Sequence, residues 1–361
     1  MADGPGQRRA SVEIPGFGDL DVIPRVPLGQ FPTPLHQSQS LGSLLGADNL
    51  WIKRDDLTGF MWGGNKVRTA EYLLGQAESL GATELVVSGG PTSNFVAVMA
   101  AAARAHGLPL HRVTYGSEYT GTAAAFEAAR QSGATVTFTG SPDRNEMDRI
   151  GRRLAADRRD FGQRAFAIPR GGATDVGALG FLFAHFELLE QVEQAGFSPT
   201  AVVIPVGSGG SIAGLLAGAA ISQSPWRLTG ASVSRPPRQI IGIVTTKAIR
   251  CAALLGIELT EASVKERLEI YDTRQPGFGQ ASSAQAKLAE RIRQSTGLFV
   301  DPTYNAKAMH WMATTEKAAG THTPIVYWHT GGILSAIDDL CRTASTQTQI
   351  QSPTNRTEQL S

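Results

Sequence analysis

The sequence centres on the stretch Trp62-Gly63-Gly64-Asn65-Lys66-Val67-Arg68. The two glycines carry no side chain, so the backbone can approach a neighbouring segment closely at this point. Lys66 follows directly, and residues 66–80 have the pattern of a helix. A lysine at a helix start in a dry pocket can have a lowered pKa, and its free amine can then form a Schiff base with a carbonyl. Most lysines are solvated surface charges, so the other segments must decide between these two interpretations.

Strand and helix patterns alternate along most of the chain. Residues 84–88, 89–94 and 95–106 have the patterns of a strand, a turn and a helix, which together form one βα unit of a parallel sheet. Further strands are predicted at 50–54, 110–115, 135–139, 165–169, 200–206, 228–234, 299–300 and 325–328. Further helices are predicted at 122–132, 146–158 and 181–194, with a loop at 177–180. The sequence therefore predicts an α/β fold with mostly parallel strands.

The composition is that of a soluble globular enzyme, with 42% apolar and 18% charged residues. The net charge is +1 and no basic run stands out, so nucleic acid is not an expected partner. No segment has the length of a membrane span or the apolar core of a signal peptide. The only two cysteines, Cys251 and Cys341, fit a reducing compartment, so we expect a cytoplasmic protein without a membrane partner. The polar segment 343–361 is predicted to be a disordered tail.

A second motif follows the most hydrophobic predicted strand. Residues 207–211 read Gly-Ser-Gly-Gly-Ser and lead into a predicted helix. Exposed backbone N–H groups and the positive end of the helix dipole form an anion site in such a loop. The loop is neither a Walker motif nor a dinucleotide fingerprint. A plain strand-to-helix turn is the alternative interpretation.

Polar and aromatic side chains follow several other strands or turns. Ser93 and Asn94 begin a predicted helix, where they can be ordinary N-cap residues or can face a ligand at the carboxyl end of a strand. Thr330 lies in His329-Thr330-Gly331-Gly332 after another strand. Phe278 lies between two glycines, and Tyr304 ends the motif Asp301-Pro302-Thr303-Tyr304. For Tyr304 by itself, without the other motifs, a buried structural tyrosine is the favoured interpretation.

Seven segments together resemble one enzyme family over about residues 24–340. They are Gly63-Gly64-Asn65-Lys66, Ser93-Asn94, Ile168-Pro169 with Gly171-Gly172, Gly177-Ala178-Leu179-Gly180, Gly207-Ser208-Gly209-Gly210, Asp301-Pro302-Thr303-Tyr304 and His329-Thr330-Gly331-Gly332. In this order they resemble the pyridoxal-phosphate enzymes of the tryptophan-synthase-β fold (fold type II). The resemblance is to the branch of D-cysteine desulfhydrase and 1-aminocyclopropane-1-carboxylate deaminase.

This resemblance implies a fold, a cofactor and a set of roles. The fold has two lobes of twisted, mostly parallel sheets with helices on both faces. A large cofactor-binding domain is expected at 1–68 and 179–342, and a small domain at 69–178. The cofactor pyridoxal 5'-phosphate would be bound by Lys66, Asn94, Gly207, Ser208, Gly209, Gly210, Ser211 and Thr330. The catalytic residues would be Lys66, Ser93 and Tyr304, and a small amino-acid substrate would contact Thr92, Ser93, Asn94, Phe95, Phe278 and Tyr304. No metal is expected, and the resemblance implies a homodimer.

Four positions depart from the family pattern. Thr92 and Phe95 flank Ser93-Asn94 where Gln and His are usual, and Phe278 replaces a tyrosine. Asn305 stands where the cyclopropane deaminases carry a glutamate near the pyridine nitrogen. In addition, the hydroxyl of Thr330 cannot hold that nitrogen protonated as a carboxylate would, so the ring should be a weaker electron sink. These features favour β-elimination of the desulfhydrase kind, giving a 2-oxo acid and ammonia.

Other functions stay open at this point. Ring-opening deamination would release 2-oxobutanoate. β-Replacement on a specialised amino acid would yield a new amino acid when a nucleophile is added, and a racemase on the same fold is a further possibility. A non-catalytic binding protein that kept the fold would turn over no amino acid at all.

Overall fold

The computed structural model describes residues 13–14, 18–19, 23–315 and 322–350. Its strands are β1 Glu13–Ile14, β2 Gly18–Asp19, β3 Leu35–Gln37, β4 Leu50–Arg54, β5 Glu84–Ser88, β6 Leu110–Thr114, β7 Thr135–Phe138, β8 Ala165–Ile168, β9 Ala201–Val206, β10 Arg227–Ser232, β11 Leu268–Asp272 and β12 Ile325–His329. Its α-helices are α1 Gln39–Leu45, α2 Lys66–Ser79, α3 Asn94–Ala105, α4 Ala124–Gln131, α5 Glu146–Asp160, α6 Asp175–Gln194, α7 Gly210–Ile221, α8 Pro237–Ala253, α9 Glu261–Lys265, α10 Ser283–Thr296, α11 Asn305–Thr314 and α12 Ile333–Ile350. Two short 3-10 helices are η1 Asp55–Leu57 and η2 Arg170–Gly172.

The larger sheet has six strands in the order β11-β10-β9-β12-β4-β3. All neighbours are parallel except β3, which runs antiparallel to β4. Helices cover both faces of this sheet, and alternate side chains of each strand point to one face or the other. In β9, Val202 and Ile204 belong to the core formed with α6, α7 and α8, whereas Val203 belongs to the core formed with α1, α10 and α11.

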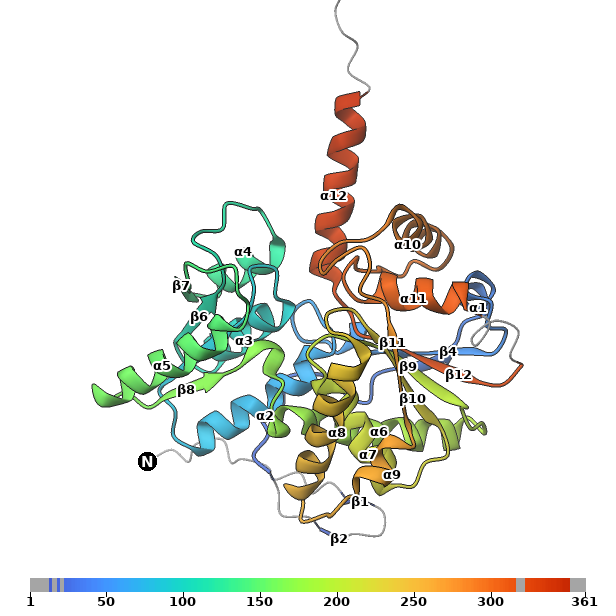
Figure 1. Ribbon diagram of the computed structural model, residues 1–361, viewed down its shortest axis with the longest axis horizontal. Coiled ribbons are helices and arrows are strands. Elements are labelled where there is room, and N and C mark those ends of the chain that lie inside the picture. Colours follow the sequence, from blue (N-terminus) through green and yellow to red (C-terminus); the bar gives the residue numbers. More distant parts are fainter. Residues whose placement is uncertain (1–12, 15–17, 20–22, 316–321, 351–361) are drawn as a thin grey trace, which may run out of the picture.

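The smaller sheet has four parallel strands in the order β7-β6-β5-β8. In β5, Leu85 and Val87 pack in the core shared with α2 and α3, and Val86 packs on the opposite side with α5. The four-stranded sheet with α3, α4 and α5 lies beside the six-stranded sheet and its helices (Figure 1). The predicted α/β architecture of twisted, mostly parallel sheets covered on both faces is confirmed.

Some predicted elements differ from those observed. Residues 299–300 form no strand, although Val300 is buried, and strand β11 was not predicted. Helix α6 begins at Asp175, six residues before the predicted start, because the hydroxyl of Thr174 accepts a hydrogen bond from the Gly177 N–H at 2.9 Å and caps the helix. Residues 177–180 are therefore helical rather than a loop.

The predicted disordered tail also needs correction in its first part. Helix α12 continues through Ile350, so residues 343–350 are helical. Residues 351–361 lie outside the described part of the chain. In Figure 1, α12 extends away from both sheets.

Helices α6 and α7 pack with little space between their backbones. A Cβ atom added to Gly214 of α7 would lie 2.1 Å from the Ala178 carbonyl oxygen of α6. This close approach requires glycine, because a side chain would force the two helices apart. Since α7 begins at residue 210, the contact also sets the position of the glycine loop that precedes it.

We predict that Gly214→Ala lowers the free energy of unfolding by about 1–3 kcal/mol or more, the usual cost of overpacking a core. Gly242→Ala is the matched control, because Gly242 is exposed in α8 and an added Cβ there would meet no atom within 4 Å. This control should raise stability by up to about 1 kcal/mol through helix propensity. Urea unfolding measures both changes, and a loss of stability in both variants would contradict the packing explanation.

Candidate active site

One cavity of about 740 Å³ lies between the two sheets. Its walls are formed by the loops that follow β5 and β8 of the small sheet and β9 and β12 of the large sheet. All four loops leave the carboxyl ends of parallel strands, which is where α/β proteins usually bind ligands. The structure brings the whole predicted set to this cavity: Lys66, Thr92, Ser93, Asn94, Phe95, Gly207, Ser208, Gly209, Gly210, Ser211, Phe278, Tyr304 and Thr330.

Lys66 is placed by two glycine turns in direct contact. A Cβ atom on Gly331 would lie 2.6 Å from the Cα of Gly64, so both turns depend on glycine, and both residues have positive φ angles. The Asn65 N–H donates to the Thr330 carbonyl oxygen at 3.0 Å, which ties the start of α2 to the end of β12. Lys66 is the first residue of α2 and faces the cavity. Burial lowers the pKa of its amine from 10.5 to about 8.

A buried ion-pair network holds the same helix from behind. The Arg68 guanidinium contacts Asp55 at 2.9 Å and Glu187 at 2.8 Å, and Lys53 also pairs with Glu187. These cations lower the pKa of the Glu187 carboxyl to about 2 against the opposing effect of burial. Arg68 is only 4% exposed, so the pairing fixes the first turn of α2.

The glycine loop, residues 207–211, forms an anion site at the start of α7. Gly209 has φ +90°, and α7 has no acidic residue in its first turn. The Gly207 carbonyl oxygen accepts hydrogen bonds from Ser234 at 2.9 Å and from Arg235 at 3.2 Å, so it points away from the backbone N–H groups. The Ser211 hydroxyl accepts from the Asn65 side chain at 3.1 Å, which links this loop to the Lys66 turn.

Ser93 and Asn94 begin helix α3 and also line the cavity, so the N-cap role and the ligand-facing position that the sequence allowed are compatible. The Ser93 hydroxyl caps α3 by accepting from the Val96 N–H at 3.3 Å, and it also lines the cavity. The side-chain oxygen of Asn94 is buried and has no hydrogen-bond partner among the described residues. An unpaired buried polar atom is costly, so this oxygen indicates a missing ligand group. Phe95, by contrast, is 2% exposed and packs in the core shared by α2 and α3.

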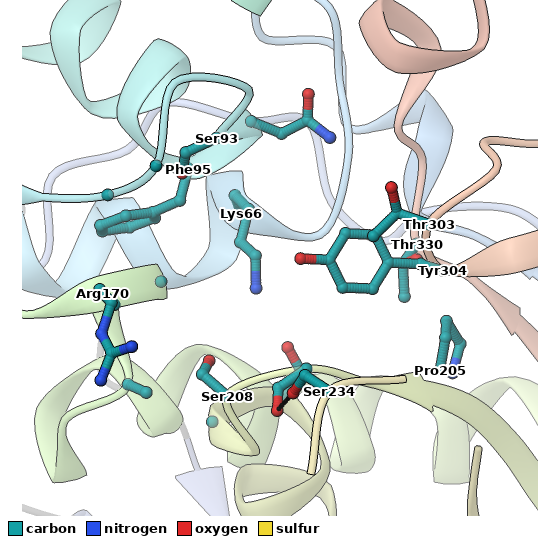
Figure 2. Close-up of a pocket in the computed structure, with 18 of the residues that line it drawn as sticks. Lys66, Ser93, Phe95, Arg170, Pro205, Ser208, Ser234, Thr303, Tyr304 and Thr330 are labelled. Atoms are coloured by element: carbon teal, nitrogen blue, oxygen red, sulfur yellow. Dashed lines mark hydrogen bonds between the residues drawn. The ribbon is translucent and has the colours of Figure 1, made fainter. Parts of the chain in front are cut away.

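A carboxylate that was not among the predicted site residues positions Tyr304. The buried Asp301 side chain accepts hydrogen bonds from the N–H groups of residues 303, 304 and 305 at 2.8–3.0 Å. Burial and the charge of Asp301 raise the pKa of Tyr304 to about 12, so its phenol keeps its proton. Figure 2 shows this hydroxyl and the Lys66 amine pointing into the same space.

Asn305 and Thr330 form a neutral group behind Tyr304. The Asn305 amide oxygen accepts from the Tyr327 hydroxyl at 2.8 Å and lies 3.4 Å from the Thr330 hydroxyl. The Asn305 amide nitrogen donates to Asp301 and to the Gly331 carbonyl oxygen, each at 2.8 Å. Asn305 is therefore fully engaged, and the Thr330 hydroxyl is the polar group of this pair that lines the cavity.

Besides Asp301, the cavity is lined by three arginines that were not among the predicted site residues: Arg144, Arg170 and Arg235. They lie in three separate segments of the chain. Arg170 stands within the motif Ile168-Pro169 with Gly171-Gly172, and the other two lie outside the seven motifs. No local pattern distinguishes these arginines from surface arginines. A conspicuous sequence feature, His329, does not line the cavity. Its ring contacts the Phe299 carbonyl oxygen at 3.1 Å and the Gly331 N–H at 3.1 Å, which is a structural role.

These features fit pyridoxal phosphate. The glycine loop and helix start suit a phosphate, the Lys66 amine suits an aldehyde, and the Asn94 side chain would be satisfied by a polar ring substituent. Within the described ranges, no group of three or more His, Cys, Asp or Glu side chains is placed to hold a metal ion. The helices of these ranges also include none that is long and apolar enough to cross a membrane.

Comparison with known proteins identifies relatives of similar length. The chain is 32% identical over 314 residues to a putative 1-aminocyclopropane-1-carboxylate deaminase of Pyrococcus abyssi, covering 87% of this chain and 93% of the relative. It is 30% identical over 326 residues to a D-cysteine desulfhydrase of Klebsiella pneumoniae, covering 87% and 95%. The crystal structure of a 1-aminocyclopropane-1-carboxylate deaminase homologue matches with a TM-score of 0.80 at 30% identity, covering 90% of this chain and 96% of the other.

The family model for pyridoxal-phosphate dependent enzymes matches residues 26–331, which contain the glycine turns, Lys66, the glycine loop and Tyr304. The resemblance predicted from the seven motifs is thereby confirmed, together with its cofactor. The chain belongs to the family of pyridoxal-phosphate dependent enzymes.

Proposed function

We propose that the protein is a lyase that removes a β-substituent from a small amino acid. The net reaction converts the amino acid and one water into a 2-oxo acid, ammonia and the protonated leaving group. The observation that carries this proposal is the convergence of the glycine loop that forms the anion site, a lysine of lowered pKa and a protonated phenol on one cavity. The similarity to a D-cysteine desulfhydrase supports the same reaction class.

The side chains of this cavity divide the chemistry between them. The cofactor, when bound, supplies an aldehyde that links to amino groups and a ring that withdraws electrons. Lys66 would hold the aldehyde and, as a free amine, would take the α-proton of the substrate. Tyr304 keeps its proton and could donate it to the departing group. Ser93 and Thr92 would bind the substrate carboxylate, and the Thr330 hydroxyl would meet the pyridine nitrogen without carrying a charge.

Ring-opening deamination of a cyclopropane amino acid is the second candidate, because a relative is named for that activity. The cavity favours elimination, since Phe278 contributes a ring without a hydroxyl and Asn305 is neutral and fully hydrogen-bonded. Release of pyruvate from β-substituted alanines supports the lyase. Release of 2-oxobutanoate from the cyclopropane substrate would support the deaminase.

We further propose a cytoplasmic homodimer with a small domain near residues 69–178. The low number of cysteines, with only Cys251 and Cys341 in the sequence, supports a reducing compartment. The dimer and the domain limits rest on the resemblance to the enzyme family. Analytical ultracentrifugation of the loaded enzyme tests the dimer.

We predict that Lys66→Ala abolishes the visible absorption band of the loaded enzyme and all release of 2-oxo acid from a panel of D- and L-amino acids. The reason is that no other amine in the cavity occupies the start of α2. Lys247→Ala is the matched control, because Lys247 also lines the cavity but lies 3.6 Å from Asp175 as an ion pair. A visible band that persists in Lys66→Ala would contradict the assignment.

The lowered pKa of Lys66 predicts how cofactor uptake depends on pH. Only the free amine attacks an aldehyde, and the amine is mostly protonated below pH 8. The rate constant for cofactor uptake by the apoenzyme should therefore rise about tenfold per pH unit below 8 and level off above it. Stopped-flow absorbance measures this rate. A rate that continues to rise up to pH 10 would indicate a lysine of ordinary pKa.

We predict that Tyr304→Phe lowers kcat by about 100-fold or more while the visible band of the cofactor stays, because a positioned proton donor is lost but the binding groups remain. Tyr115→Phe is the control, since Tyr115 also lines the cavity but is not held by Asp301. Steady-state kinetics and absorbance are measured on both variants. An unchanged kcat in Tyr304→Phe would assign the proton transfer to another group.

A further inference from the structure

Three arginines line the cavity, and we call Arg144, Arg170 and Arg235 the arginine cluster. They come from separate loops, after β7, after β8 and after β10. Burial and the positive charges of Arg170 and Arg144 lower the pKa of Arg235 against the opposing charge of Asp148, so Arg235 lies within electrostatic range of both other arginines. Like charges gathered in a cavity destabilise the unliganded protein unless anions bind there.

Two members of the cluster lie on the side of the glycine loop. Arg170 pairs with Asp148 at 2.8 Å, and the next residue, Gly171, lies against Ser208, because an added Cβ atom would be 2.8 Å from the Ser208 hydroxyl. Arg235 donates to the Gly207 carbonyl oxygen at 3.2 Å. Arg170 is therefore neutralised by an internal carboxylate, and Arg235 is held by a backbone carbonyl of the glycine loop.

Among the described residues, Arg144 differs from the other two in having neither an ion pair nor a hydrogen bond to its guanidinium, whereas Arg170 pairs with Asp148 and Arg235 donates to a backbone carbonyl. The Arg144 Nε atom is buried and has no hydrogen-bond partner among the described residues. Its guanidinium lies 4.2 Å from the centre of the Phe278 ring and 5.9 Å from that of Tyr115. An aromatic face attracts a guanidinium but leaves the N–H groups at its edge free to bind an anion.

The stack on Phe278 also places Arg144 beside the reacting groups. The Phe278 ring stands edge-on to the Tyr304 ring with centres 6.0 Å apart, and the charge of Arg144 acts on the Tyr304 phenol. Because Phe278 follows β11 of the large sheet and Arg144 follows β7 of the small sheet, the stack crosses the cavity between the two sheets. A substrate that reaches from the Ser93 side toward Tyr304 would present the end of its side chain to Arg144.

We propose that the substrate carries a second anionic group, a carboxylate or a group of like charge, at the end of its side chain, and that Arg144 binds this group. The inference rests on the proposed function for the place of the α-carboxylate. Arg144 is then the specificity-determining residue, with Phe278 as the platform that fixes its guanidinium. A planar guanidinium suits this task because it can donate two parallel hydrogen bonds to one carboxylate.

The test compares two compounds that differ only in charge, S-carboxymethylcysteine and its amide S-carbamoylmethylcysteine, as both enantiomers. Wild type, Arg144→Gln and the control Arg152→Gln are used as loaded enzymes. Arg152 is exposed on α5 and does not line the cavity. Two readouts are taken: kcat/KM from 2-oxo acid release, and Kd from calorimetry.

We expect the wild type to favour the acid over the amide by about 10- to 100-fold, the usual effect of a charge-assisted hydrogen bond. Arg144→Gln should remove this preference by weakening the acid alone, and Arg152→Gln should retain it. Equal values for acid and amide in the wild type, failure of the acid to bind, or an equal loss of both compounds in Arg144→Gln would overturn the inference.

The two readouts separate this inference from the proposed function. If the acid binds more tightly through Arg144 but no amino acid releases a 2-oxo acid, the lyase proposal fails and the anion site stands. If neutral amino acids are turned over and the charge has no effect on either readout, the lyase proposal stands and the anion site fails.

Discussion

The site depends on one backbone contact, the packing of the turn at Gly64 against the turn at Gly331. A Cβ atom on Gly331 would lie 2.6 Å from the Gly64 Cα, and one on Gly64 would lie 3.3 Å from the Thr330 carbonyl oxygen. Both residues also have positive φ angles, which favour glycine. The contact brings the end of β12 next to the start of α2. There the Asn65 N–H donates a hydrogen bond to the Thr330 carbonyl oxygen. Lys66 thereby reaches the carboxyl edge of the large sheet, although α2 itself packs partly against the small one.

Burial in the cavity shifts the pKa values of the two groups that this contact helps to bring together, the Lys66 amine and the Tyr304 phenol. The Lys66 amine loses water, and its pKa falls to about 8. Burial, together with the charge of Asp301 behind it, raises the pKa of the Tyr304 phenol to about 12. One environment thus favours the neutral form of both groups, one able to accept a proton and the other able to donate one. The charges that stabilise α2 are kept on its far side, where Arg68, Asp55 and Glu187 neutralise one another.

Local patterns in the sequence were enough to identify the family, because each motif encodes a backbone requirement that glycine or a cap residue meets alone. They were less reliable for element limits. The glycines at 177 and 180 suggested a loop, yet both lie in helix α6. Gly180 is required by packing instead, because a Cβ atom there would lie 2.3 Å from the Arg68 carbonyl oxygen of α2. The strand predicted at 299–300 is absent, because Val300 is buried by packing and not by pairing in a sheet.

The sequence by itself determined the α/β fold, the lysine, the glycine loop and the phenol, because these depend on residue type at fixed spacing along the chain. Only the tertiary structure showed that Asp301 positions Tyr304 and that three arginines meet in one cavity. Arg144 and Phe278 are 134 positions apart in the chain. They stack because the two sheets bring the carboxyl ends of their strands together. No spacing rule describes such a contact, since it depends on how the sheets pack.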